Sequence, residues 1–224
     1  MAFHEITRMS IVVRIICALI VGGIIGLERG AKNRPAGLRT YMLVCVGACL
    51  IMLTNQYIYQ FTGSGDPMRL GAQVVSGIGF LGAGTIIVTK HNQIKGLTTA
   101  AGLWAAAGVG LALGIGFYEA AITAALSIYV VLTIVQKWEN RIHRKNRFLE
   151  VYVEIEHDLH FSELTQQLRN LEFSIENIQF ESDLGVDSNS HAVVLSLKSS
   201  KKEDHHMLLR QIKKIKGISY IEEL

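Results

Sequence analysis

A short charged stretch beside the first apolar segment holds the residues best suited to chemistry. Glu28 lies near the end of that segment, and Arg29, Arg34 and Arg39 follow it closely. A carboxylate at membrane depth is costly unless it is paired. The sequence therefore predicts an ion pair between Glu28 and at least one of these arginines. Such a pair would either lock the first two helices together or contact an ion or a partner protein.

Other patterns indicate neither catalysis nor a bound metal or cofactor. Residues 77–82 match the dinucleotide-binding pattern GxGxxG, but they lie inside an apolar segment rather than in a soluble βαβ unit. His157 and His160 belong to the tightest set of candidate ligands, whereas a zinc site needs three or four. The sequence has no Walker loop, nucleophile elbow or HExxH motif. We expect no enzyme activity, no cofactor, no metal site and no nucleic-acid partner.

Long apolar segments predict an α-helical polytopic membrane domain over residues 1–147. A transmembrane helix needs about 20 mostly apolar residues. Five segments meet this length: 10–28, 38–59, 70–89, 97–116 and 117–136. Small residues recur at four-residue spacing, which lets helix backbones approach closely in lipid. The pairs and triplets of this kind are Gly22/Gly26, Gly79/Ala83 and Ala106/Gly110/Gly114.

The basic residues predict the orientation in the bilayer. They gather after the first, third and fifth segments, and positive charge marks the cytoplasmic side. We therefore expect a multi-pass protein of a bacterial inner membrane, with its N-terminus outside and its C-terminus in the cytoplasm. Arg14 lies inside the first segment, and its long side chain is expected to reach the outer interface.

Residues 148–224 have a different character. They carry 8 basic and 14 acidic residues, whereas residues 1–147 carry 14 basic and 5 acidic ones. Apolar residues alternate in strand-like stretches that are separated by two helical patterns, at 161–171 and 201–215. The order βαββαβ predicts a small α+β, ferredoxin-like cytoplasmic domain. A domain of this size is near the lower limit for independent folding, so we expect it to form a homodimer.

Three blocks of sequence resemble the MgtC/SapB family. The first block is Gly26–Arg29 followed by Ala36–Thr40, the second is Ser76–Gly84, and the third is Gly96–Ala101 followed by Leu103 and Trp104. The tail resembles the ACT-like domain that some members carry. The resemblance points to these functional-motif residues: Glu28, Arg29, Arg34, Pro35, Gly37, Arg39, Thr40, Gly77, Gly79, Phe80, Gly82, Gly84, Thr98, Thr99 and Trp104.

The resemblance implies a non-enzymatic regulatory protein that supports adaptation to low magnesium. Family members are thought to act on other membrane proteins, including the F-type ATP synthase, and some support survival of pathogens in macrophages. Virulence-factor members tend to have Asn in place of Thr98 and Cys in place of Ala105, which favours a housekeeping or SapB-like member. The alternative is a transporter of Mg²⁺ or another small ion, with backbone carbonyls of a broken third helix replacing the missing midplane carboxylates.

Overall fold

The computed structural model describes residues 6–64, 66, 68–89, 93–143, 148–156, 161–181, 190–199 and 205–223. The chain divides into two compact units, Met1–Gln136 and Lys137–Leu224. The first unit is built mainly of helices and the second of a sheet with helices. The coarse fold expected from the sequence, apolar helices followed by an α/β domain, is confirmed.

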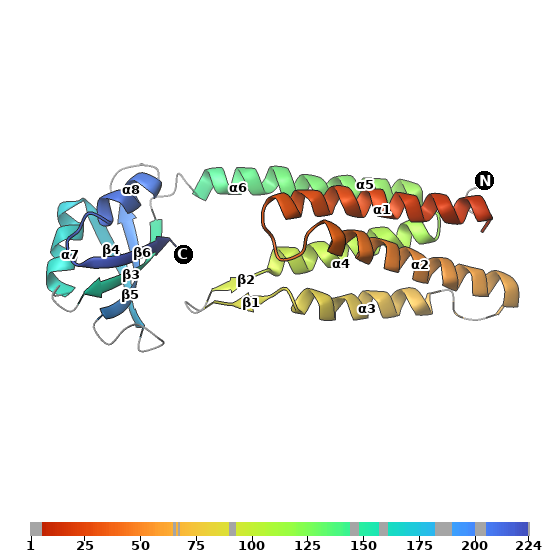
Figure 1. The fold of residues 1–224 in the computed structure, drawn as a ribbon, viewed down its shortest axis with the longest axis horizontal. Helices are drawn as coiled ribbons and strands as arrows, with labels where there is room; N and C mark the ends of the chain where they lie inside the picture. The colour runs from red at the N-terminus through yellow and green to blue at the C-terminus, as the bar shows by residue number, and fades with distance from the viewer. Residues whose placement is uncertain are drawn as a thin grey trace. The chain divides into compact units, whose positions relative to one another are not determined.

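The helices of the first unit alternate in direction along the chain (Figure 1). They are α1 (Arg8–Ala31), α2 (Leu38–Thr62), α3 (Arg69–Ala83), α4 (Leu97–Gly114) and α5 (Tyr118–Val130). A π-helical turn, η1 (Val131–Val135), joins α5 to α6 (Gln136–His143). Helix α2 packs against α1, α3 and α4, and α4 also packs against α5. Four described stretches are long and apolar enough to cross a bilayer: Arg8–Ala31, Leu38–Thr62, Leu97–Gly114 and Tyr118–Glu139.

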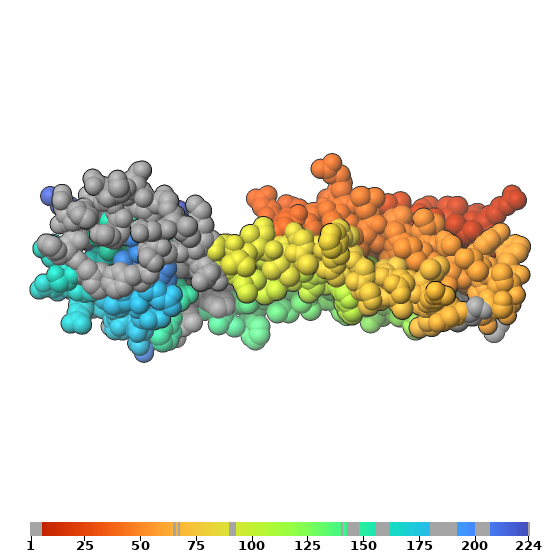
Figure 2. All heavy atoms as spheres, turned by 90° about the horizontal axis from the view of Figure 1, so that it is seen from below, coloured from red at the N-terminus to blue at the C-terminus, as the bar shows by residue number. Residues whose placement is uncertain are grey.

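The third span was predicted over residues 70–89, and the predicted end of its helix is wrong. Helix α3 has 15 residues and ends at Ala83, so it is about 22 Å long, against a hydrocarbon core of about 30 Å. The residues that follow form a short antiparallel hairpin of β1 (Ile87–Val88) and β2 (Ile94–Lys95). Residues 85–89 are all β-branched, which favours a strand over a helix. Figure 2 shows α3 and this hairpin on the surface of the unit, alongside α2.

Glycine is required where the hairpin returns to α4. Gly96 has a φ of +101°, a conformation that residues with a side chain rarely adopt. A Cβ at this position would also clash with the carbonyl group of Thr85. The close return fixes the start of α4 beside the end of α3.

Small residues allow the close helix contacts expected at two of the three predicted sites. A Cβ added at Gly22 would lie 2.7 Å from the carbonyl oxygen of Tyr41 on α2. One added at Gly114 would lie 2.6 Å from the carbonyl oxygen of Cys49. Gly79 makes no such contact within the described residues, because none of their heavy atoms lies within 4 Å of a Cβ built there.

Arg14 is buried in the helix bundle, so the prediction that it reaches the lipid interface is wrong. Its side chain is 0% exposed. Nη1 donates hydrogen bonds to the carbonyl oxygen of Gly114 and to Oε1 of Gln56, each at 2.7 Å. Gly114 is the last residue of α4, where carbonyl groups lack partners within the helix. The guanidinium therefore caps α4 and joins it to α1 and α2.

From β3 onward, the second unit has the element order βαββαβ that the sequence predicts. Its elements are β3 (Phe148–Glu156), α7 (Phe161–Asn170), β4 (Phe173–Glu181), β5 (Ser190–Ser199), α8 (His205–Ile212) and β6 (Ile218–Glu223). The four strands form an antiparallel sheet in the order β4-β5-β3-β6. Alternate residues of β3, from Leu149 to Ile155, are buried in a core that includes Leu164 of α7 and Leu208 of α8. His157 and His160 lie outside the described residues.

Candidate functional site

Two connections of the first unit lie at one end of its bundle (Figure 1). They are the turn between α1 and α2 and the hairpin after α3. We call this end the Glu28 end, because Glu28 lies on the last turns of α1 there. All three blocks of the predicted motif have residues at this end, which makes it the candidate functional site.

Glu28 forms the ion pair that the sequence predicts. Its Oε2 accepts a hydrogen bond from Nε of Arg29 at 2.5 Å, and its Oε1 pairs with Nζ of Lys32 one helical turn away. Arg29 is 1% exposed, and the Glu28 side chain is 12% exposed. The other predicted partners, Arg34 and Arg39, are exposed and form no ion pair with Glu28.

The remaining donors of these cations bind the π-helical turn. Nη2 of Arg29 donates to the carbonyl oxygen of Leu132 at 2.6 Å and to Oε1 of Gln136 at 3.1 Å. Nζ of Lys32 donates to the same two oxygens at 3.2 and 2.8 Å. A π-helix shifts the backbone hydrogen-bond pattern from i+4 to i+5, which frees a carbonyl group for outside donors. We call Glu28, Arg29, Lys32, the Leu132 carbonyl and the Gln136 amide the Arg29 clamp.

The Arg29 clamp corrects the predicted lock between the first two helices. It joins α1 to η1 and to the start of α6, not to α2. Two cations face one carboxylate there, and neutral carbonyl and amide oxygens supply the further acceptors. A buried charge is tolerated only when it is paired and its donors are used. The clamp therefore acts first as a structural fastening between distant segments of the chain.

The three sequence blocks meet in a small pocket of about 350 Å³. Its walls come from the α1–α2 turn, from the end of α3 and from α4. The lining residues are Pro35, Ala36, Thr40, Phe80, Leu81, Ala83, Gly84, Thr85 and Leu103. The structure thus brings together Pro35, Thr40, Phe80 and Gly84 of the predicted motif.

Other motif residues serve helix packing or lie on the surface. Gly37 begins α2 as its N-cap, close to the backbone of Gly30. Gly82 faces Ala100 of α4, where an added Cβ would lie 3.4 Å from the alanine Cβ. Thr99 is buried in α4. The side chains of Thr98 and Trp104 are exposed on the same helix.

Helix α3 presents different small residues on different faces. Gly77 faces a groove beside α2, whereas Gly79 lies on the outward face. Residues at helical spacing along that outward face are exposed: Ala72, Val75, Ser76, Gly79 and Ala83. We call these five residues the α3 outer face. The described part of the first unit does not cover it.

Sequence reasoning missed Lys32, Gln136 and Tyr41. The spacing of Lys32 from Glu28, four residues on a helix, was a usable signal for an ion pair. The apolar pattern of a π-helical turn does not differ from that of an ordinary α-helix. Nothing in the sequence therefore indicated the role of Gln136. Tyr41 is fully buried, and within the described residues its hydroxyl has no hydrogen-bond partner. It fits because Gly102 opposite has no side chain: a Cβ there would lie 2.5 Å from the Tyr41 oxygen.

Comparison with known proteins decides the family. The MgtC family model matches residues 15–141, more than half of the chain. The chain belongs to the MgtC family. The matched region contains the Arg29 clamp, the pocket and every motif residue predicted from the sequence. The resemblance noted in the sequence is therefore confirmed.

Several curated relatives are similar over most of the chain. An uncharacterized protein of Haemophilus influenzae is 35% identical, over 88% of this chain and 86% of its own length. Protein SapB of Bacillus subtilis is 31% identical, over 79% of each chain. A putative magnesium transporter, YhiD of Escherichia coli K12, is 37% identical over 62% of this chain and 67% of its own length.

Proposed function

We propose that this chain is a non-enzymatic regulatory protein of a bacterial inner membrane. It supports adaptation to low magnesium by contacting other membrane proteins. Its membership of the MgtC family supports this proposal, and the name of its relative YhiD, a putative magnesium transporter, supports the link to magnesium alone. Family resemblance also makes the F-type ATP synthase a candidate partner.

The observation that carries the proposal is the α3 outer face. Helices associate in lipid through small residues that let their backbones approach closely. At Gly22 and Gly114 the chain uses such residues for its own packing. Ala72, Ser76 and Gly79 instead face outward, and a Cβ at Gly79 would meet nothing within 4 Å. A transmembrane helix of a partner protein fits this surface.

The Arg29 clamp gives the regulatory proposal a structural basis. Its charged groups bind one another and the oxygens of η1 and α6. Arg29 and Lys32 occupy the Leu132 carbonyl and the Gln136 amide oxygen, which are acceptors of the kind that Mg²⁺ would need. The clamp thus connects α1 to η1 and to Gln136, and is suited to holding this last part of the first unit in place.

The proposed topology keeps five membrane crossings. Helix α3 is short, but it runs beside α2 and α4 between the two ends of the bundle (Figure 1). With five crossings the basic Glu28 end faces the cytoplasm and the N-terminus lies outside. Reporter fusions after residue 65 should read as periplasmic, and fusions after residues 93 and 150 as cytoplasmic. The reverse reading at two of these sites would refute the five-span arrangement.

We also propose that the second unit is an ACT-like regulatory domain that dimerises or binds a small ligand. Its βαββαβ order and antiparallel sheet support this assignment. Strands β4 and β6 form the two sheet edges, and each leaves backbone groups available for pairing with a second copy. Pairing across a twofold axis would bring two membrane units into one assembly.

The second candidate function is transport of Mg²⁺ or another small ion, which the name of YhiD favours. Uptake by liposomes that contain only the purified full-length chain separates the two functions. For a regulator, Mg²⁺ entry into these liposomes should equal entry into protein-free liposomes of the same lipid. Entry that saturates with Mg²⁺ and scales with the amount of protein would establish a transporter instead.

A further inference from the structure

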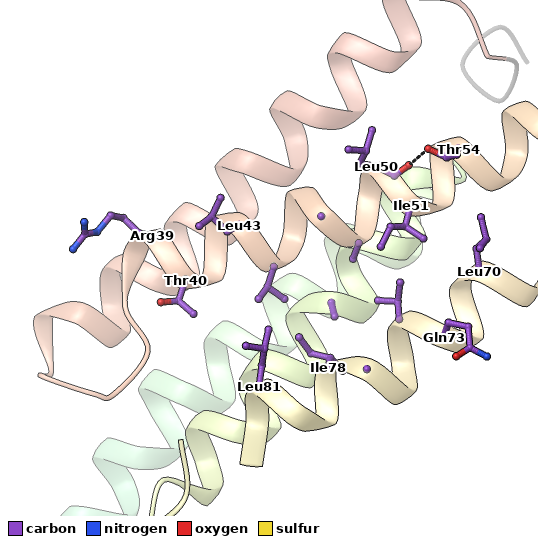
Figure 3. Close-up of a pocket in the computed structure, with 16 residues that line it drawn as sticks. Arg39, Thr40, Leu43, Leu50, Ile51, Thr54, Leu70, Gln73, Ile78 and Leu81 are labelled. Atoms are coloured by element: carbon purple, nitrogen blue, oxygen red, sulfur yellow. Dashed lines mark hydrogen bonds between the residues drawn. The ribbon is translucent and has the colours of Figure 1, made fainter. Parts of the chain in front are cut away.

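A second, larger cavity lies along the outside of the bundle. It is a groove of about 1060 Å³ between α2 and α3, with Ala107 of α4 at its base (Figure 3). Most of its lining residues are aliphatic. Leu43 and Leu50 of α2 remain 72% and 52% exposed, and Leu81 of α3 is 49% exposed. The groove therefore opens to the surroundings of the bundle along its length.

The dimensions of the groove suit an acyl chain. Its lining runs along α2 from Arg39 to Thr54, a distance of about 22 Å at the helical rise. One leaflet contributes about 15 Å of hydrocarbon, half of the bilayer core. The groove is therefore long enough to hold an acyl chain of a lipid in one leaflet. Gly47 and Gly77 widen the groove, because a Cβ at either position would meet no heavy atom within 4 Å.

The two ends of the groove differ in charge. Arg39 lies at the Glu28 end, and Figure 3 shows its guanidinium directed away from the apolar side chains. Arg39 is exposed, and it has no ion pair or hydrogen bond within the described part of the chain. Neutral residues line the other end: Gln73, and Thr54, whose hydroxyl donates to the Leu50 carbonyl at 2.9 Å. An apolar groove with an exposed arginine at one end complements an amphiphile with an anionic head.

We propose that this groove is a binding site for an anionic phospholipid. An acyl chain lies between α2 and α3, and the phosphate pairs with the guanidinium of Arg39. A planar guanidinium can donate two parallel hydrogen bonds to phosphate oxygens. Basic pockets between transmembrane helices bind anionic headgroups by the same chemistry. The site uses the face of α3 that carries Gly77, so it is separate from the α3 outer face.

Native mass spectrometry of the full-length protein tests the site. The protein is released from vesicles of equal phosphatidylglycerol and phosphatidylcholine content, and the retained lipid is identified. We expect phosphatidylglycerol to be retained in excess. Arg39→Gln should lower the retention of phosphatidylglycerol about fivefold, because one basic contact with the anionic headgroup is lost. Arg34→Gln is the matched control, because Arg34 is an exposed arginine of the adjacent α1–α2 turn and does not line the groove.

A second pair of variants tests the apolar part of the site. Gly47→Leu places a side chain in the groove, whereas Gly108→Leu adds the same side chain at an exposed glycine of α4 outside it. Among the described residues, no heavy atom lies within 4 Å of a Cβ at either position, so both variants should fold. We expect Gly47→Leu to remove retained phosphatidylglycerol and Gly108→Leu to leave it unchanged.

Three results would overturn the proposal. One is equal retention of the two lipids by the unaltered protein. Another is equal retention of phosphatidylglycerol by the Arg39→Gln and Arg34→Gln variants. The third is a lipid-free dimer that Gly47→Leu dissociates, which would assign the groove to a second copy of the chain.

Discussion

The Arg29 clamp makes a quantitative prediction about the stability of the membrane unit. Arg29→Met removes the 2.5 Å hydrogen bond to Glu28 and the bonds to Leu132 and Gln136, at a side chain that is 1% exposed. Removing one partner of a buried ion pair typically costs about 3–5 kcal/mol. Glu28 is partly exposed and keeps its contact with Lys32, so we expect the lower figure, about 3 kcal/mol.

That loss is large enough to measure by thermal unfolding of the full-length protein in detergent. For a chain of this size it corresponds to a fall of roughly 6–12 °C in the unfolding midpoint. Far-UV circular dichroism reports the loss of helix. Arg34→Met is the control, because Arg34 is exposed, and we expect it to change stability by less than about 0.5 kcal/mol.

A double-mutant cycle tests whether Gln136 is a partner of Arg29. Arg29→Met combined with Gln136→Leu should cost less than the sum of the single changes, because both remove the same contact between α1 and α6. Strict additivity, or an Arg29→Met variant as stable as Arg34→Met, would refute the clamp.

Three further predictions concern other parts of the chain. Gly102→Ala should destabilise the membrane unit, because its Cβ would press on the buried Tyr41 hydroxyl, and Tyr41→Phe should restore much of the loss in a thermal unfolding assay. Residues 148–224, expressed alone, should fold and sediment as a dimer; a folded monomer at high concentration would contradict this. The Tyr220 hydroxyl donates to a Glu222 oxygen at 3.1 Å, which raises the pKa of Tyr220 above its ordinary 10. The stabilisation from this bond is present below the pKa of the unfolded chain and is lost as pH rises through the folded value. Ultraviolet titration of the full-length protein should show that Tyr220 ionises at a raised pH, and Glu222→Gln should lower the pKa of Tyr220.

Local patterns in the sequence predicted the elements that depend on local chemistry. Apolar segments of suitable length located α1, α2, α4 and α5, because a bilayer-spanning helix must be long and apolar. Alternation of apolar residues located β3, since one face of the strand packs on a core. The pairing of Glu28 with Arg29 followed from the cost of a lone carboxylate at membrane depth.

Features that depend on distant contacts could not be predicted in this way. The spacing of Gly79 and Ala83 suggested a close contact, but spacing does not say which face of α3 meets a neighbour. Arg14 was expected at the lipid interface, because the sequence does not show that the end of α4 supplies its carbonyl partner. The π-helical turn at Leu132 likewise has its partners about 100 residues away, on α1.

Growth at limiting magnesium tests the central claim most directly. A strain that lacks this protein is complemented with the unaltered chain, with Gly79→Leu on the α3 outer face, or with Gly108→Leu on α4. Both glycines are exposed, and neither has a heavy atom within 4 Å of an added Cβ. At matched membrane levels we predict that Gly79→Leu fails to support growth and that Gly108→Leu supports it fully. Full growth with Gly79→Leu would contradict a regulatory contact through the α3 outer face.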